Sequence, residues 1–107
     1  MKNYFRVQQK DISFAEMQVF NSYDGGDGYS EGLAVSISPA GLDGGSKFGG
    51  AWDAMDDDDE VVVMTGTIIC KIYDGYRIRP VSEVARFTVS EWAEMLEDGR
   101  AWEFETL

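Results

Sequence analysis

The sequence predicts an α+β fold in which a small antiparallel sheet carries one or two packed helices. A run of β-branched residues that begins at Val61 leads through Asp74-Gly75 into a second strand, which is typical of a β-hairpin. A capped segment between Thr88 and Gly99 has apolar residues at helical spacing. With 107 residues the chain has room for one core, so we expect a single domain over residues 1–107.

Composition limits the classes of function. Apolar residues make up 44% of the chain, which is enough to build a core. Twenty acidic residues against nine basic ones, with no histidine, give a net charge of −11. This charge repels nucleic acid and anionic membranes and attracts basic protein surfaces. No apolar stretch approaches the ~20 residues of a membrane span, and residues 1–4 do not resemble a signal peptide, so we expect a cytoplasmic protein.

The first half of the chain contains three predicted elements. Alternating residues from Asn3 to Gln8 predict a strand, and the mixed pattern from Asp11 to Phe20 predicts a short helix with Asp11 as its N-cap. Alternation over residues 33–38 predicts a second strand that Pro39 ends, because proline has no N–H for the ladder.

The turn of the hairpin allows two registers. A two-residue turn at Asp74-Gly75 would pair Ile72 with Arg77 and mix apolar and basic side chains on one face. A three-residue turn over 73–75 pairs Ile72 with Tyr76 and separates the two kinds of side chain. We therefore expect the second register.

The C-terminal third contains the clearest helix signal. Pro80 is expected to end the hairpin ladder, and a separate short strand then ends at Thr88. Thr88 and Glu91 form a capping box that starts a helix, which Gly99 ends. Residues 102–104 are expected to form a last edge strand. The apolar stripe of the helix comprises Val89, Trp92, Ala93 and Leu96.

Residues that could carry chemistry are few. The single cysteine, Cys70, lies in the β-branched run, so we expect a buried residue of a reducing compartment. No motif for a catalytic nucleophile or a phosphate loop is present, so the sequence predicts no catalytic residue, cofactor or metal site. A glycine-rich loop offers oxygen ligands for calcium without EF-hand spacing, and we interpret it as a solvated turn. Those ligands would be Asp24, Asp27, Ser30 and Glu31.

Two acidic segments are the candidate contact sites. Five consecutive acids repel one another unless a basic partner, a cation or water relieves them. They are Asp56, Asp57, Asp58, Asp59 and Glu60. Glu91, Glu94 and Asp98 form a second acidic line along the outer face of the predicted helix, and hydration alone also accounts for both segments. Trp52 is either an aromatic anchor for the partner or a core residue.

The combination of small size, acidity, one cysteine and two acidic segments resembles small phage-encoded anti-defence proteins. These are the anti-CRISPR and antirestriction inhibitors, several of which mimic nucleic acid, whose duplex carries one charge per ~1.7 Å. The resemblance implies a non-enzymatic inhibitor in the host cytoplasm. Its partner would be the basic surface of a nuclease or CRISPR effector, without direct contact to nucleic acid or membrane.

Two alternative interpretations remain. An immunity protein that neutralises a toxin nuclease would have the same acidity. The order of Arg6, a serine-bearing strand at 33–38 and Glu83 resembles mono-ADP-ribosyltransferase-like domains, although the spacing is compressed. That resemblance implies that Arg6 and Glu83 hold a nicotinamide nucleotide.

Overall fold

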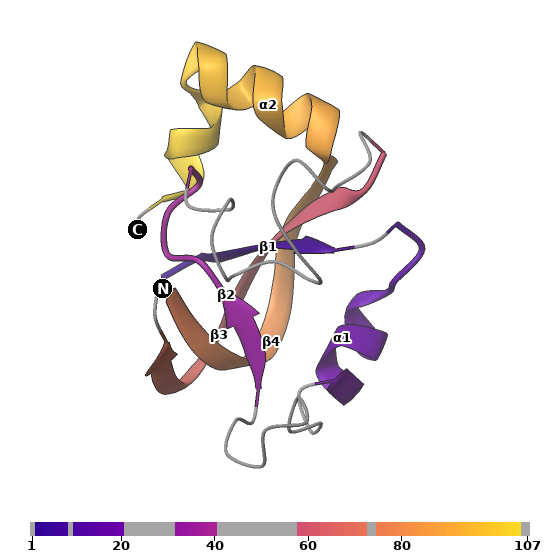
Figure 1. Cartoon of the computed structure of the whole chain (residues 1–107), viewed down its shortest axis with the longest axis vertical. Coiled ribbons are helices and arrows are strands. Elements are labelled where there is room, and N and C mark those ends of the chain that lie inside the picture. The colour runs from indigo at the N-terminus through magenta and orange to yellow at the C-terminus, as the bar shows by residue number, and fades with distance from the viewer. Residues whose placement is uncertain (1, 9, 21–31, 41–57, 73–74, 106–107) are drawn as a thin grey trace.

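The computed structural model describes residues 2–8, 10–20, 32–40, 58–72 and 75–105, and it confirms the α+β class (Figure 1). The elements are, in chain order, β1 (Tyr4–Gln8), α1 (Phe14–Phe20), β2 (Leu33–Val35), β3 (Glu60–Ile72), β4 (Gly75–Thr88), α2 (Val89–Asp98) and the 3-10 helix η2 (Arg100–Phe104). No helix in these ranges is long and apolar enough to cross a membrane.

The four strands form one antiparallel sheet in the order β1-β3-β4-β2. β1 and β2 stand at opposite ends of this order, yet Phe5 of β1 forms a bridge with Ser36, directly after β2. The Phe5 N–H donates to the Ser36 carbonyl at 2.9 Å, and the Ser36 N–H donates back at 2.8 Å. The sheet is therefore curled, with long curved β3 and β4 strands, until its two ends meet (Figure 1).

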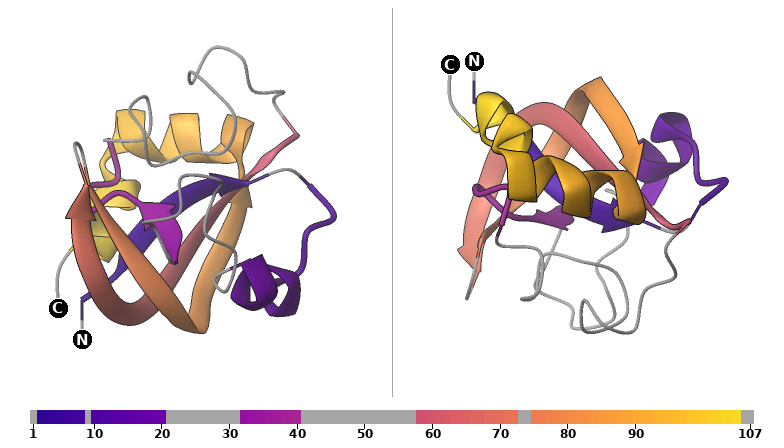
Figure 2. Two further views of the ribbon diagram at one scale, coloured as in Figure 1. Left: turned by 60° about the horizontal axis from the view of Figure 1, so that its bottom comes forward. Right: turned by 90° about the horizontal axis from the view of Figure 1, so that it is seen from above.

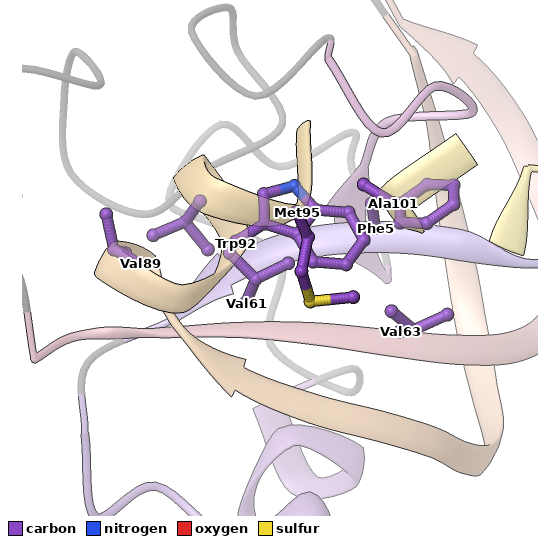
Figure 3. Packing of buried hydrophobic residues seen from close by; sticks show 8 residues of the cluster. Phe5, Val61, Val63, Val89, Trp92, Met95 and Ala101 are labelled. Atoms are coloured by element: carbon purple, nitrogen blue, oxygen red, sulfur yellow. The ribbon is translucent and has the colours of Figure 1, made fainter. Parts of the chain in front are cut away.

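Both faces of the sheet are buried, and the two helices lie on different sides of it (Figure 2). The first core lies beneath α2, where the Trp92 ring packs between helix and sheet (Figure 3) and its Nε1–H donates to the Pro39 carbonyl at 3.0 Å. The first core comprises Phe5, Val7, Val61, Val63, Val89, Trp92, Met95 and Ala101. The second, which includes Met17 of α1, comprises Tyr4, Met17, Leu33, Val35, Val62, Met64 and Ile78. Burial of both faces explains the unbroken valine run.

The N-terminal elements follow the prediction with local corrections. α1 begins at Phe14, and its cap is Ser13, whose Oγ accepts from the Glu16 N–H at 3.1 Å. Asp11 is not the N-cap, because it lies in a left-handed turn with φ 69° before the helix begins. β2 is shorter than predicted, since the chain leaves the β4 ladder after Val35.

Neither predicted hairpin register is correct. Ile72 lies opposite Gly75 and Cys70 opposite Arg77. The register then shifts at Ile69, where β3 contains one extra residue, so that Ile68 lies opposite Ile78. This shift places Ile78 in the second core, and a turn-based argument could not include that long-range burial. Cys70 is exposed rather than buried, because this end of β3 extends beyond both cores.

Pro80 does not end the ladder. β4 continues through Pro80, which lies opposite Gly66, and runs on to Thr88. The register shifts beside Pro80, where Val81 has no partner on β3, and an irregular position tolerates the missing N–H of proline. Gly66 allows a close approach of the two strands, because an added Cβ would lie 2.7 Å from the Arg79 carbonyl oxygen.

α2 has the predicted bounds and the predicted capping box. The Thr88 Oγ1 accepts from the Glu91 N–H at 3.0 Å, and the Glu91 carboxylate accepts from the Thr88 N–H at 2.9 Å. Gly99 ends the helix in the left-handed conformation, with φ 86°. Met95 replaces the predicted Ala93 in the buried stripe, and Ala93 is exposed.

Residues 102–104 form part of η2 and not an edge strand. After the turn at Gly99 the chain folds back toward the first core, where Ala101 is fully buried and Phe104 packs on Trp92 with ring centroids 6.1 Å apart. The Asn3 amide group donates to the Phe104 carbonyl at 3.0 Å. Residues 100–104 are therefore held by packing on the first core and by the Asn3 hydrogen bond, and not by pairing with a strand.

Candidate functional site

The described part of the predicted acidic run begins with an exposed ion pair. Asp58 accepts from the Lys10 ammonium at 2.6 Å, and this hydrogen bond lowers the pKa of the Asp58 carboxyl below its ordinary value. Asp56, Asp57 and Trp52, which complete the predicted contact segment, lie outside the described residues, as does the predicted calcium loop from Asp24 to Glu31.

The next two acids of the run turn toward the protein. Asp59 is buried, and its carbonyl accepts from the Val89 N–H at 2.7 Å, which ties the start of β3 to the start of α2. Glu60 is half-buried, and its carboxylate accepts from the Arg86 guanidinium at 2.8 Å. These two residues therefore have structural contacts within the chain.

Arg86 is the centre of a polar cluster on the face of the sheet that carries the second core. Its Nη1 donates to the Ile12 carbonyl at 2.7 Å in addition to Glu60, and its Nη2 donates to Glu83 at 2.7 Å. Burial lowers the pKa of Arg86, but the hydrogen bonds and charges of Glu83 and Glu60 outweigh that effect and raise this pKa above its ordinary value. One guanidinium thus forms ion pairs with two carboxylates.

The acids at the C-terminal end have different surroundings. Glu94, Glu97 and Glu103 are exposed, and within the described ranges none of their carboxylates forms a hydrogen bond or an ion pair. We call these three residues, on α2 and η2, the C-terminal acidic surface. α2 and η2 lie together at one end of the molecule, at the top of Figure 1.

The predicted line of Glu91, Glu94 and Asp98 is exposed as expected, but only Glu94 has an uncommitted carboxylate. Glu91 completes the capping box. Asp98 accepts from the backbone N–H of Arg100 at 3.0 Å and from its side chain at 2.7 Å, and these bonds lower the pKa of the Asp98 carboxyl. Glu97 and Glu103, which the sequence argument did not include, have carboxylates without a partner in the described ranges, whereas the predicted Glu91 and Asp98 do not.

Sequence reasoning missed Trp102. Its side chain is 44% exposed on η2, directly before Glu103, whereas the sequence predicted only that this residue belongs to an edge strand. Gly99 is the signal that could have indicated this arrangement, because a helix stop followed by a short aromatic segment favours a compact turn over an extended strand. An exposed indole beside free carboxylates is a candidate anchor for a partner.

The structure brings together only some of the residues on which the mono-ADP-ribosyltransferase-like alternative depends. The bridge between Phe5 and Ser36 places the serine-bearing segment beside Arg6. Glu83 lies opposite Met64 of β3, which in turn lies opposite Tyr4 of β1, so one strand separates Glu83 from β1. Its carboxylate is also bound to Arg86. The arrangement therefore does not join Arg6 and Glu83 in one site.

The described ranges contain no group of three or more side chains that could hold a metal ion. Comparison with protein-family models found no match, and comparisons with curated proteins and with solved structures found no significant match.

Proposed function

We propose that this chain is an acidic binding protein that inhibits a nucleic-acid-binding complex by occupying its basic surface. The partner would be a nuclease or CRISPR effector, and the chain would be of the phage-encoded anti-CRISPR or antirestriction type, acting in the cytoplasm of the host cell. The C-terminal acidic surface carries the proposal, because Glu94, Glu97 and Glu103 are exposed carboxylates without a basic partner in the described structure.

Electrostatics favours this end of the molecule over the start of β3. Asp58 and Glu60 already have basic partners within the chain, so a new partner would have to compete with Lys10 and Arg86. The carboxylates of Glu94, Glu97 and Glu103 need only lose water. Trp102 adds apolar area that a row of charges lacks, and tryptophan is among the residues that contribute most to interface affinity. The acidity also disfavours direct contact with nucleic acid or anionic membrane.

A pair of triple variants tests the proposal. E94Q/E97Q/E103Q removes the charges of the C-terminal acidic surface, and D11N/E16Q/D58N removes as many charges from exposed acids elsewhere. Wild type and both variants would be immobilised and exposed to a bacterial lysate at about 0.05 M salt. Bound protein would be eluted up to about 0.5 M salt and identified by mass spectrometry.

We expect wild type and D11N/E16Q/D58N to retain a nucleic-acid-binding protein that salt releases, and E94Q/E97Q/E103Q to lose it. The chain should then displace nucleic acid from the purified target in a competition assay. Equal retention by the two variants, or a captured protein whose nucleic-acid binding is unaffected, would contradict the proposal. A target encoded as a toxin nuclease would identify the immunity-protein alternative, which uses the same surface.

A further inference from the structure

One edge of β3 has no neighbouring strand over its second half. β1 pairs with β3 only from Glu60 to Met64, whereas β4 accompanies β3 as far as Ile72. Within the described ranges no strand pairs with the other edge of residues 65–72. We call the free part of that edge, residues 67–72, the open edge. Its backbone N–H and C=O groups that point away from β4 are available to a further strand.

The open edge has few of the features that keep an edge strand single. Natural edge strands are protected by prolines, by several charged side chains or by bulges. Residues 65–72 contain no proline and only one charged residue, so the protection consists of that base and the extra residue at Ile69. Ile68 is 48% exposed, which adds apolar area that a partner could cover. The exposed residues are Thr67, Ile68, Cys70 and Lys71.

The charge pattern favours a second copy of this chain as the occupant. The net charge of −11 makes two copies repel each other in most orientations, but residues 65–72 contain no acid. If two open edges pair antiparallel about a two-fold axis near Ile69, the two Lys71 residues lie roughly 14 Å apart along the strands. Arg77 and Arg79 lie on β4, so those of the two copies are three strand spacings apart, also roughly 14 Å. Both separations exceed the Debye length of about 8 Å.

An acid lies at the end of the edge where the second strand would finish. Tyr4 is opposite Met64, and the residue before it, Asn3, donates to the Phe104 carbonyl at 3.0 Å. η2, with Glu103, therefore lies where β1 stops and the open edge begins. In an antiparallel pair, the Lys71 end of the second copy arrives at this point. Glu103 and Lys71 are both exposed and have no partner in the described ranges, so each copy offers the other one acid and one base.

We propose that two copies of this chain pair antiparallel through residues 67–72 of β3, with Lys71 of each copy beside Glu103 of the other. Such a contact uses the same surface on both copies and closes as a dimer. We expect a dissociation constant on the order of 100 μM, because a six-residue edge buries less than the ~1,600 Å² of a standard interface. The pairing does not depend on the proposed function, and it leaves Glu94 and Glu97 exposed.

Sedimentation equilibrium of the full chain at pH 7, under reducing conditions and from about 0.01 to 1 mM, tests the dimer. Wild type should show a monomer–dimer equilibrium. Lys71→Glu and Glu103→Lys should each weaken dimerisation at least about tenfold, because an opposite-charge pair becomes a like-charge pair. The double variant K71E/E103K should return to within about threefold of wild type, because it restores the pair with its signs exchanged. Glu94→Lys is the control, since it reverses an exposed acid that the pairing does not use, and it should not weaken the dimer.

Crosslinking through the exposed Cys70 locates the contact. For any two-fold axis between residues 68 and 70, the two Cys70 residues lie within roughly 15 Å, so a bismaleimide of that length should link the wild-type dimer. K71E at the same concentration should give little covalent dimer.

A wild type that stays monomeric throughout the concentration range would overturn the proposal. So would a dimer that neither single charge reversal weakens, or one that the bismaleimide does not link. A monomer whose Cys70 is shielded from maleimide by another protein would assign the open edge to a different partner, and it would also overturn the proposal.

Discussion

Asp58 to Glu60 at the start of β3 and Glu94, Glu97 and Glu103 of the C-terminal acidic surface differ in what their carboxylates contact. Asp58 and Glu60 are paired with Lys10 and Arg86, whereas the three C-terminal carboxylates contact no base in the described structure. The bases that neutralise the first region are distant in sequence, by 48 residues for Lys10 and 26 for Arg86. The density of acids along a sequence therefore does not identify the surface that is free to bind.

Substitution of Arg86 should have the largest effect on stability and tests the contrast between the two acidic regions most directly. Arg86→Ala leaves Glu60 half-buried without its partner and also removes the bonds to Glu83 and Ile12. We expect the free energy of unfolding to fall by about 2 to 3 kcal/mol, at the low end of the cost of breaking a buried ion pair, because the groups are partly exposed. Urea unfolding followed by tryptophan fluorescence measures this change.

Arg100→Ala is the matched control, because Arg100 is exposed and pairs with Asp98 on the surface. Its effect should be clearly smaller than that of Arg86→Ala. If the two variants lose equal stability, the start of β3 is not held by Arg86, and the contrast between the two acidic regions fails.

Single neutral variants of one acid from each region sharpen the contrast. Glu60→Gln should destabilise the fold by about 1 kcal/mol, because the bond to Arg86 loses its charge. Glu94→Gln should change the stability by less than about 0.5 kcal/mol, as for most surface substitutions away from specific contacts. The same urea titration distinguishes them. A larger loss for Glu94→Gln would show that its carboxylate has a structural role.

The smallest expected effect concerns acid pH. Hydrogen bonds hold the folded-state pKa values of Asp58 and Asp98 below the ordinary value of an aspartate, so their ion pairs contribute stability above the unfolded-state pKa and lose it as the pH falls through the folded-state pKa. Between pH 5 and about pH 3 the Tm should therefore decrease. D58N/D98N should decrease less steeply, and salt should reduce the difference. An equal pH dependence for wild type and variant would show that these exposed pairs contribute nothing.

Local signals predicted some elements well. α2 runs from Val89 to Asp98 as expected, because its capping box and its stop at Gly99 involve residues close in sequence. The hairpin was predicted as a pair of strands, but its register was not. The pairing of β3 with β4 contains three register shifts. The shift at Ile69 brings Ile78 into the second core, and that long-range burial is not encoded in the residues of the turn.

The candidate site shows the same division. Exposure of Glu94 followed from helical spacing, since the opposite face carries Trp92. The ion pairs of Asp58 with Lys10 and of Glu60 with Arg86 did not follow from any local pattern in the sequence. Trp102 was placed in a strand, and its exposure on η2 depends on how the chain packs after Gly99.

The sequence by itself determined the fold class, the net charge and the bounds of α2, because these depend on composition or on contacts within a few residues. Only the tertiary structure decided which carboxylates are neutralised, that Arg6 and Arg77 lie on either side of β2, and that Cys70 is exposed. The reason is physical: charge pairing and burial depend on distances in space, and in a curled sheet these distances join residues that are far apart along the chain.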